Sequence, residues 1–143
     1  MRSTSQPVCL SFTLCEAVVR DLDSGRQAIV GTLDHVFVDQ CPARGLVFTA
    51  FFEVTGVLGL ACFEIRLLKA SDPWLPFDLR GFDALASWRI PDRFVPDEAD
   101  VATVAAGLGG AAFPEFGDYW FVLFLNDAPL LARRFGLRSR RVS

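Results

Sequence analysis

The single histidine of the chain, His35, follows Asp34 and is the residue best suited to act as a general base near neutral pH. In many hydrolases an Asp–His pair activates a serine or cysteine nucleophile. Neighbouring residues of a strand point to opposite faces, so we expect Asp34 and His35 not to share a site. The sequence also lacks a nucleophile-elbow motif. We therefore predict no catalytic residue and expect the protein not to be an enzyme.

Four cysteines could supply thiolates for a metal or sulfur atoms for disulfides: Cys9, Cys15, Cys41 and Cys62. They contain no C-x-x-C pair, and one histidine cannot complete the usual zinc patterns. A site of four cysteines from distant strands stays open as an alternative. We expect free thiols that are buried, with Cys15 as a small core residue, and we predict neither a metal nor a cofactor.

Two aspartates with a spacing of two, Asp21 and Asp23, stand before a glycine and resemble the start of a calcium loop. An EF-hand would need a bidentate glutamate at the twelfth position, which is Thr32 here. A C2-like sandwich would instead collect aspartates from several loops, and Asp97 and Asp100 could then join the pair. Aspartates before glycine are typical of a hairpin turn whose carboxylates bond their own backbone, and we predict such a turn.

The C-terminal segment from residue 133 to residue 143 holds five arginines and no acidic residue: Arg133, Arg134, Arg138, Arg140 and Arg141. Such a segment could contact phosphates. No aromatic stacking platform interleaves with the arginines, and the rest of the chain is acidic, which argues against nucleic acid as a partner. We expect residues 138–143 to form an arginine-rich tail that is solvated or folds onto an acidic surface of its own chain or of a partner.

The aromatic stretch at residues 119–125 has apolar residues in every position. Side chains alternate along a strand, so Trp120, Val122 and Phe124 point away from the face formed by the other four. Either residues 70–80 or a bulge accounts for this second face, or it is an exposed patch that binds another chain. We predict the latter, with these three residues as an interface. The opposite face would consist of Tyr119, Phe121, Leu123 and Leu125.

Short strand signals separated by turn residues recur along the chain and favour an all-β sandwich. The segments at 46–55 and 60–68 are expected to pair around Gly56 and Gly59, and Gly31 is expected to mark a bulge or a close backbone approach. Residues 91–100 are expected to form an acidic loop. Strands are predicted at residues 10–20, 27–33 with a continuation through 36–38, 46–55, 60–68, 84–90, 101–108 and in a closing hairpin at 113–135.

The closing hairpin begins with Gly117, Tyr119 and Phe121 in a Gly-x-Tyr-x-Phe pattern that resembles the tyrosine corner of immunoglobulin-like sandwiches. In that motif the tyrosine hydroxyl bonds to upstream backbone. Asn126 and Asp127 then supply the turn of the hairpin. The pattern predicts an immunoglobulin-like, Greek-key, antiparallel β-sandwich of about seven to nine strands.

The composition fits one domain at residues 1–143, with a flexible N-terminus at 1–8. Hydrophobic residues make up 52% of the chain, yet no apolar run approaches the ~18 residues of a membrane span. The N-terminal segment lacks the cleavage site of a secretory signal, so we expect a cytoplasmic protein without membrane insertion. Arginine supplies all but one of the fourteen basic residues, which suggests a bacterial source.

Three segments together resemble a bacterial family of small, uncharacterised immunoglobulin-like β-sandwich proteins: LCEAVVRDLDSGRQAIVGTLDHVFV at 14–38, FEIRLLKAS at 63–71 and FPEFGDYWFVLFLNDAPLLARRF at 113–135. The resemblance covers residues 10–137 and departs at 70–99, which is long and rich in proline. It implies the fold and carries no catalytic residues, so it implies no mechanism.

These observations lead us to predict a non-enzymatic protein-interaction or assembly module whose partner is another protein or a second copy of the chain. The alternative is a β-sandwich that binds a small ligand or an ion through its loops, like a C2 or carbohydrate-binding domain. In that case Trp74, Phe77 and Trp88 would form the platform for the ligand.

Overall fold

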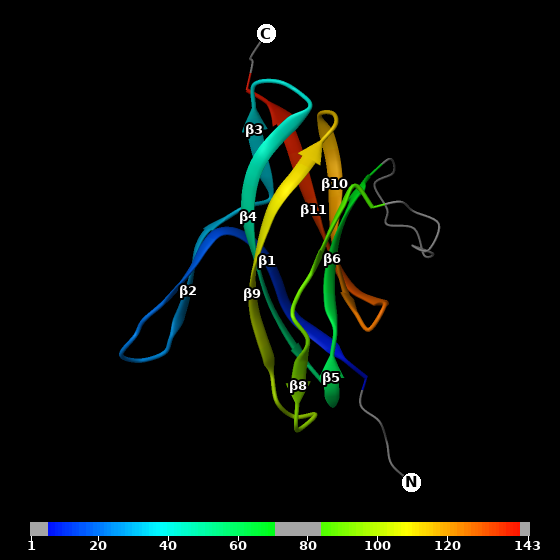
Figure 1. Cartoon of the computed structure of the whole chain (residues 1–143). Helices are drawn as coiled ribbons and strands as arrows, with labels where there is room; N and C mark the ends of the chain where they lie inside the picture. Colours follow the sequence, from blue (N-terminus) through cyan, green and yellow to red (C-terminus); the bar gives the residue numbers. More distant parts are fainter. Residues whose placement is uncertain (1–5, 71–83, 141–143) are drawn as a thin grey trace.

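The computed structural model describes residues 6–70 and 84–140, and these residues form eleven β-strands and no helix (Figure 1). The predicted all-β class is therefore confirmed, with more strands than the seven to nine expected. No described segment could cross a membrane as a helix. The strands are β1 (Val8–Arg20), β2 (Gln27–Thr32), β3 (His35–Val38), β4 (Ala43–Thr55), β5 (Gly59–Ala61), β6 (Phe63–Lys69), β7 (Ala86–Arg89), β8 (Arg93–Val95), β9 (Ala102–Phe113), β10 (Gly117–Leu125) and β11 (Ala128–Ser139).

Two sheets form the layers of the sandwich. Sheet A has the strand order β2-β1-β4-β9, and sheet B has the order β3-β11-β10-β6-β7. Neighbouring strands are antiparallel, except that β3 runs parallel to β11. A short ribbon of β5 and β8 stands apart from both sheets. The architecture is thus an antiparallel sandwich with one parallel edge.

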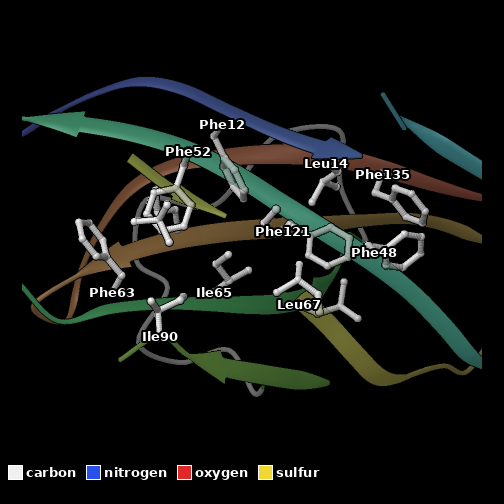
Figure 2. Close-up of a cluster of buried hydrophobic side chains, with 14 of the residues drawn as sticks. Phe12, Leu14, Phe48, Phe52, Phe63, Ile65, Leu67, Ile90, Phe121 and Phe135 are labelled. Atoms are coloured by element: carbon white, nitrogen blue, oxygen red, sulfur yellow. The ribbon is translucent and has the colours of Figure 1, made fainter. Parts of the chain in front are cut away.

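An aromatic core joins the two sheets (Figure 2). Phe52 of sheet A meets Phe63 of sheet B with ring centroids 5.1 Å apart, and Phe48 meets Phe135 at the same distance. Both pairs have the edge-to-face geometry that aromatic quadrupoles favour. In β6, Phe63, Ile65 and Leu67 are buried while Glu64 and Arg66 lie on the other face, so the period-two pattern of this segment predicted its orientation correctly.

The predicted tyrosine corner is present at the start of β10. The Tyr119 hydroxyl donates to the carbonyl oxygen of Glu115 at 2.5 Å and accepts from the Glu115 N–H at 3.2 Å. Burial raises the pKa of this hydroxyl above its usual value. Gly117 has a φ of 134°, which only glycine adopts readily, and a Cβ there would lie 2.7 Å from Lys69 Nζ. Tyr119 and Phe121 are both fully buried.

The predicted turn between β10 and β11 is also confirmed. Asn126 and Asp127 have φ values of 48° and 68°, and two positive φ values in a two-residue loop define the type I′ turn of a tight hairpin. The Asn126 side chain accepts from the N–H of Cys62, and the Asn126 N–H donates to the Cys62 carbonyl oxygen. These bonds anchor the turn beside the start of β6.

The predicted hairpin of residues 46–55 with 60–68 is wrong. β4 pairs with β1 and β9, and β6 pairs with β10 and β7. Gly56 and Gly59, at φ values of 80° and 88°, carry the chain out of sheet A instead of closing a tight turn. Strand pairing is then interrupted at Cys62, so β5 and β6 belong to different sheets. The predicted loop at 91–100 contains a further strand, β8.

The expected continuation of β2 through residues 36–38 also differs. After β2 the chain leaves sheet A, and β3 pairs with β11 in sheet B, where His35 lies opposite Gly136. β11 extends to Ser139, so Arg138 of the predicted tail lies within a strand. This crossing from one sheet to the other shapes the surface where the candidate site lies.

Candidate functional site

A two-stranded arm projects from the sandwich where β1 and β2 continue beyond the part of β1 that pairs with β4, and Figure 1 shows it as the blue hairpin at the left. β4 pairs with β1 only as far as Cys15, and β2 pairs with β1 only from Cys15 onward. Within the described part of the chain, residues 16–31 therefore have no strand on either outer side. We call residues 16–31 the arm.

The arm has one face without any polar side chain. Residues directly opposite each other in an antiparallel pair share a face. Ala17 lies opposite Val30 and Val19 opposite Ala28, so these four form one face, which we call the apolar arm face. Val19 is 54% exposed and Val30 44% exposed. The other face is mixed, because Val18 and Ile29 alternate there with Glu16, Arg20 and Gln27.

The tip of the arm is a turn held together by Asp21. Its carboxylate accepts from the Asp23 N–H and from the Ser24 hydroxyl, each at 3.0 Å. These hydrogen bonds hold the pKa of Asp21 below its usual value. The predicted turn is thus confirmed. Leu22 stands at the apex with 95% of its surface exposed.

Gly31, near the base of the arm, has a φ of 67°, and a Cβ at this position would lie 2.8 Å from Cδ of Glu16. The group that approaches Gly31 is the Glu16 side chain and not a second backbone, and the register of β1 with β2 has no shift here, so the positive φ is what the glycine accommodates. Below it the chain leaves the arm and crosses toward sheet B.

A cavity of about 460 Å³ lies at the base of the arm, between the open edge of β1 and β11. We call it the base cavity. Arg133 of β11 crosses between the sheets here, and its Nε donates to the Phe12 carbonyl oxygen at 2.5 Å. Among the described residues no carboxylate lies within ion-pair distance of Arg133. The cavity is lined by Phe12, Thr13, Leu14, Thr32, Leu33, Asp34, Arg133 and Arg134.

A second cavity of about 440 Å³ adjoins the base cavity through their common residues Asp34 and Arg134. His35 lies in it, with Nδ1 only 2.5 Å from Oδ1 of Asp34. The expectation that these two side chains do not share a site is wrong, because Asp34 precedes β3 and does not follow the alternation of the strand. The described residues of the lining include no serine, threonine or cysteine. Its residues are Asp34, His35, Phe37, Asp118, Arg134, Gly136 and Arg138.

The arginines of the second cavity are bound to one carboxylate. Asp118 accepts from Arg134 at 2.6 Å and from Arg138 at 2.9 Å, and these bonds hold the pKa of Asp118 below its usual value. Arg140 lies 3.6 Å from Asp39. These three arginines of the predicted tail region thus pair with acidic groups of their own chain. Arg133 differs from them, since its partner in the described structure is a backbone carbonyl.

A family model matches residues 10–138, from within β1 to within β11, and so includes the arm, both cavities and the core. The chain belongs to DUF6941, a family of unknown function. No curated protein matches it.

The predicted interface of this DUF6941 protein lies on the outer face of sheet B. Val122 is fully buried and Phe124 is 4% exposed within the single chain, and both pack with Leu68. Arg66 covers the ring of Phe124 at 4.1 Å from its centroid. Trp120 is half-buried, and its buried indole N–H has no partner in the described structure. We considered this face either as covered within the chain or as an exposed patch for another chain. Val122 and Phe124 are covered within the chain, so this face offers a partner little apolar surface.

The predicted ligand platform falls into two parts. Trp74 and Phe77 lie at residues 71–83, outside the described residues, as does most of the segment expected to cover Val122. Trp88 lies in β7, where its ring stacks on Phe121 with centroids 6.1 Å apart. Its indole N–H donates to the Gly109 carbonyl oxygen at 2.9 Å. Trp88 therefore joins the edges of the two sheets, and its ring is not free for a ligand.

The cysteines of the DUF6941 chain are free thiols. Cys15 is buried as expected, yet it lies outside the core, because Leu14 takes the core-facing position and the Cys15 thiol donates to the Thr49 carbonyl oxygen at 3.4 Å. Burial raises the pKa of Cys9 and of Cys15. In the described ranges, no group of three or more histidine, cysteine, aspartate or glutamate side chains could hold a metal ion.

Sequence reasoning missed both the arm and the base cavity. The hairpin at 10–33 was predicted, and its alternation of Ala17 and Val19 was available as a signal for one apolar face. That the hairpin extends beyond sheet A depends on where β4 stops pairing, which is a tertiary property. The sequence identified Arg133 only as one of five arginines near the C-terminus. No local pattern predicted that its side chain lies between two sheets.

Proposed function

We propose that this protein is a non-enzymatic interaction module that binds a protein partner through its arm. The observation that carries the proposal is the apolar arm face, which stands in solvent and contains no polar side chain. An isolated two-stranded hairpin is marginally stable in water. A partner strand or surface on the arm would bury Val19 and Val30 and stabilise it.

The open edges of the arm support the same proposal. Unpaired strand edges present backbone N–H and C=O groups that can accept a further strand. At β9, the other edge of sheet A, side chains already occupy outward carbonyls: Arg93 donates to Thr103 at 2.8 Å and Trp88 to Gly109. β9 is blocked in this way, whereas the arm is open in the described structure.

The surroundings of His35 differ from those of a histidine that activates a serine or cysteine nucleophile. The Asp34–His35 pair is solvated, with 87% and 49% of the side chains exposed. The described residues that line the second cavity supply no hydroxyl or thiol side chain, so the pair has no protein nucleophile to activate there.

A second candidate function is the binding of a small anion in the base cavity. Arg133, Thr13 and Thr32 are among the residues that line it, and guanidinium and hydroxyl groups are donors that suit a carboxylate or a phosphate. Inorganic phosphate and acetate that raise the melting temperature of the wild type but not of Arg133→Met would favour this candidate over the first.

The interaction proposal is tested by a photoreactive residue at position 19, on the apolar arm face. We expect cross-linking in the producing cell to a partner that mass spectrometry identifies, and loss of that adduct when Val30 is replaced by Lys. The control places the photoreactive residue at Val47, which is 72% exposed on β4. Absence of an adduct at position 19, or equal yields at both positions, would overturn the proposal.

The same proposal includes three features of context. The free thiols support a reducing compartment such as the cytoplasm. The tyrosine corner supports an immunoglobulin-like classification of the sandwich. The predominance of arginine among the basic residues supports a bacterial source.

A further inference from the structure

The tip of the arm and the base cavity are complementary in chemistry. The tip presents an exposed apolar side chain, Leu22, between two carboxylates, Asp21 and Asp23. The base cavity combines apolar walls, such as Leu33, with the guanidinium of Arg133, which has no carboxylate partner in the described structure. An acidic tip with an apolar centre and a basic cavity with apolar walls fit each other.

The tip cannot reach the base of its own arm, because the arm is extended. Residues 14 to 22 of β1 and the turn span about 26 Å at roughly 3.3 Å per residue. The midpoint of this segment of residues 14 to 22 is Val18, which pairs with Ile29. A two-fold axis at this level, with two arms lying antiparallel, brings the tip of each arm to the base of the other.

We propose that two copies of this chain associate through their arms about such an axis, with Leu22 of each copy in the base cavity of the other and the tip aspartates paired with Arg133. This inference rests on the proposed function and names its partner. The two contacts are equivalent, as a two-fold interface requires.

The remaining groups of the two surfaces agree with this arrangement. In an antiparallel pairing the open edges of the two arms lie side by side, so that the apolar arm faces of both copies, with Val19 and Val30, join into one continuous face. Among the described residues that line the base cavity, Asp34 is the only carboxylate, and the arginines that flank the tip, Arg20 and Arg26, carry the opposite charge. A second copy supplies all of these groups at once, which is why we favour it over an unrelated protein.

Charge exchange tests the tip contact. In the variant Asp23→Arg both contacts of a dimer would set arginine against Arg133, and in Arg133→Glu both would set Asp23 against glutamate. We expect each variant alone to dimerise at least tenfold more weakly than the wild type in sedimentation equilibrium. Mixed in equal amounts they form a heterodimer in which both contacts again join opposite charges, so the mixture should regain the wild-type mass.

Two further variants control this experiment. Leu22→Ser removes an apolar group that is 95% exposed in the single chain, so we expect unchanged melting of the monomer and a weaker dimer. Asp100→Arg makes the same charge change in the exposed loop before β9 and should leave dimerisation unchanged. Circular dichroism of Arg133→Glu checks that loss of its bond to Phe12 has not unfolded the protein.

The outcomes separate the inference from the proposed function. A wild type that stays monomeric at several hundred micromolar overturns the second copy as partner, while a cross-link from position 19 to another protein would still uphold the interaction module. A wild-type dimer that is equally strong in Asp23→Arg, Arg133→Glu and Leu22→Ser overturns the tip contact. Failure of the mixed variants to associate, with both variants folded, does so as well.

Discussion

Replacing Tyr119 by Phe isolates the contribution of the corner hydroxyl to stability. The ring remains, so its edge-to-face contact with Phe113 at 5.0 Å and the Lys69 ammonium 4.6 Å above it are kept. The variant loses one hydrogen bond donated to Glu115 and one accepted from it. At about 0.5–1.5 kcal/mol each, these bonds set a range of about 1–3 kcal/mol.

The lower end of that range is the expected value. Glu115 is exposed, so water can replace the hydroxyl as a partner for its backbone groups. We expect a loss of about 1–1.5 kcal/mol in the free energy of unfolding, measured by urea denaturation, with an unchanged m value. In a chain of this size the melting temperature should fall by about 3–6 °C.

Tyr119→Leu is the matched control, since it also removes the ring and should cost about 1–3 kcal/mol more than Tyr119→Phe. A Tyr119→Phe variant within error of the wild type would show that the corner bonds do not stabilise the fold. A loss equal to that of Tyr119→Leu would show that the hydroxyl determines the position of the ring and that the contacts with Phe113 and Lys69 do not hold it by themselves.

Three further predictions concern the same end of the sandwich. Phe121→Ala should lower the free energy of unfolding by about 3–5 kcal/mol in urea, because it combines transfer loss with a cavity, and a loss below 1 kcal/mol would contradict the central position of β10. Because the pKa of Asp118 is lowered in the fold, its contribution is present above its unfolded pKa of about 3.9 and is lost as the pH falls through the folded value. The stability difference between wild type and Asp118→Asn should therefore be constant from pH 6 to 8 and shrink below about pH 4, whereas a difference independent of pH would rule out the ion pair with Arg134. Gly117→Ala should lower the free energy of unfolding by about 1–3 kcal/mol, because alanine is strained at a φ of 134°. Adding Lys69→Ala should not restore the melting temperature in thermal melts, because it removes the contact with the ammonium and leaves the backbone strain.

The parts of the fold that were predictable are those that local chemistry determines. Tyr119 with Gly117 identified the corner, Asn126-Asp127 identified the hairpin turn, and the alternation around Ile65 identified a buried face. Each of these signals acts over a few residues, so the sequence carries it directly.

The parts that were not predictable depend on pairing between distant residues. β8 is three residues long and lies between Pro91 and Pro96. It is a strand only because it pairs with β5, where Phe94 lies opposite Leu60. Only the short strand β5 separates β4 from β6 in the chain, yet β4 and β6 pair with other strands. Two glycines between strands indicate a hairpin and a crossing between sheets equally well.

The candidate site was less predictable than the fold. Asp34 and His35 come together because Asp34 lies in the crossover to sheet B, and the rule of alternation applies only inside a strand. The base cavity is formed by β1 and β11, at opposite ends of the sequence, and its position follows from how far β2 and β3 cover their neighbours. How many residues of β2 and β3 pair with their neighbours depends on the packing of the two sheets and not on the residues of these edge strands alone.

The order of strands in sheet B has a consequence for synthesis on the ribosome. All four strands of sheet A precede residue 114, so the whole of sheet A leaves the ribosome before β10 and β11 do. Until then Phe12, Phe48 and Phe52 have no opposite layer to cover them, because β10 is the strand on which β6 and β11 assemble. The nascent chain therefore exposes an aromatic sheet face until β10 arrives, and over that interval this face is the part of the molecule most open to aggregation.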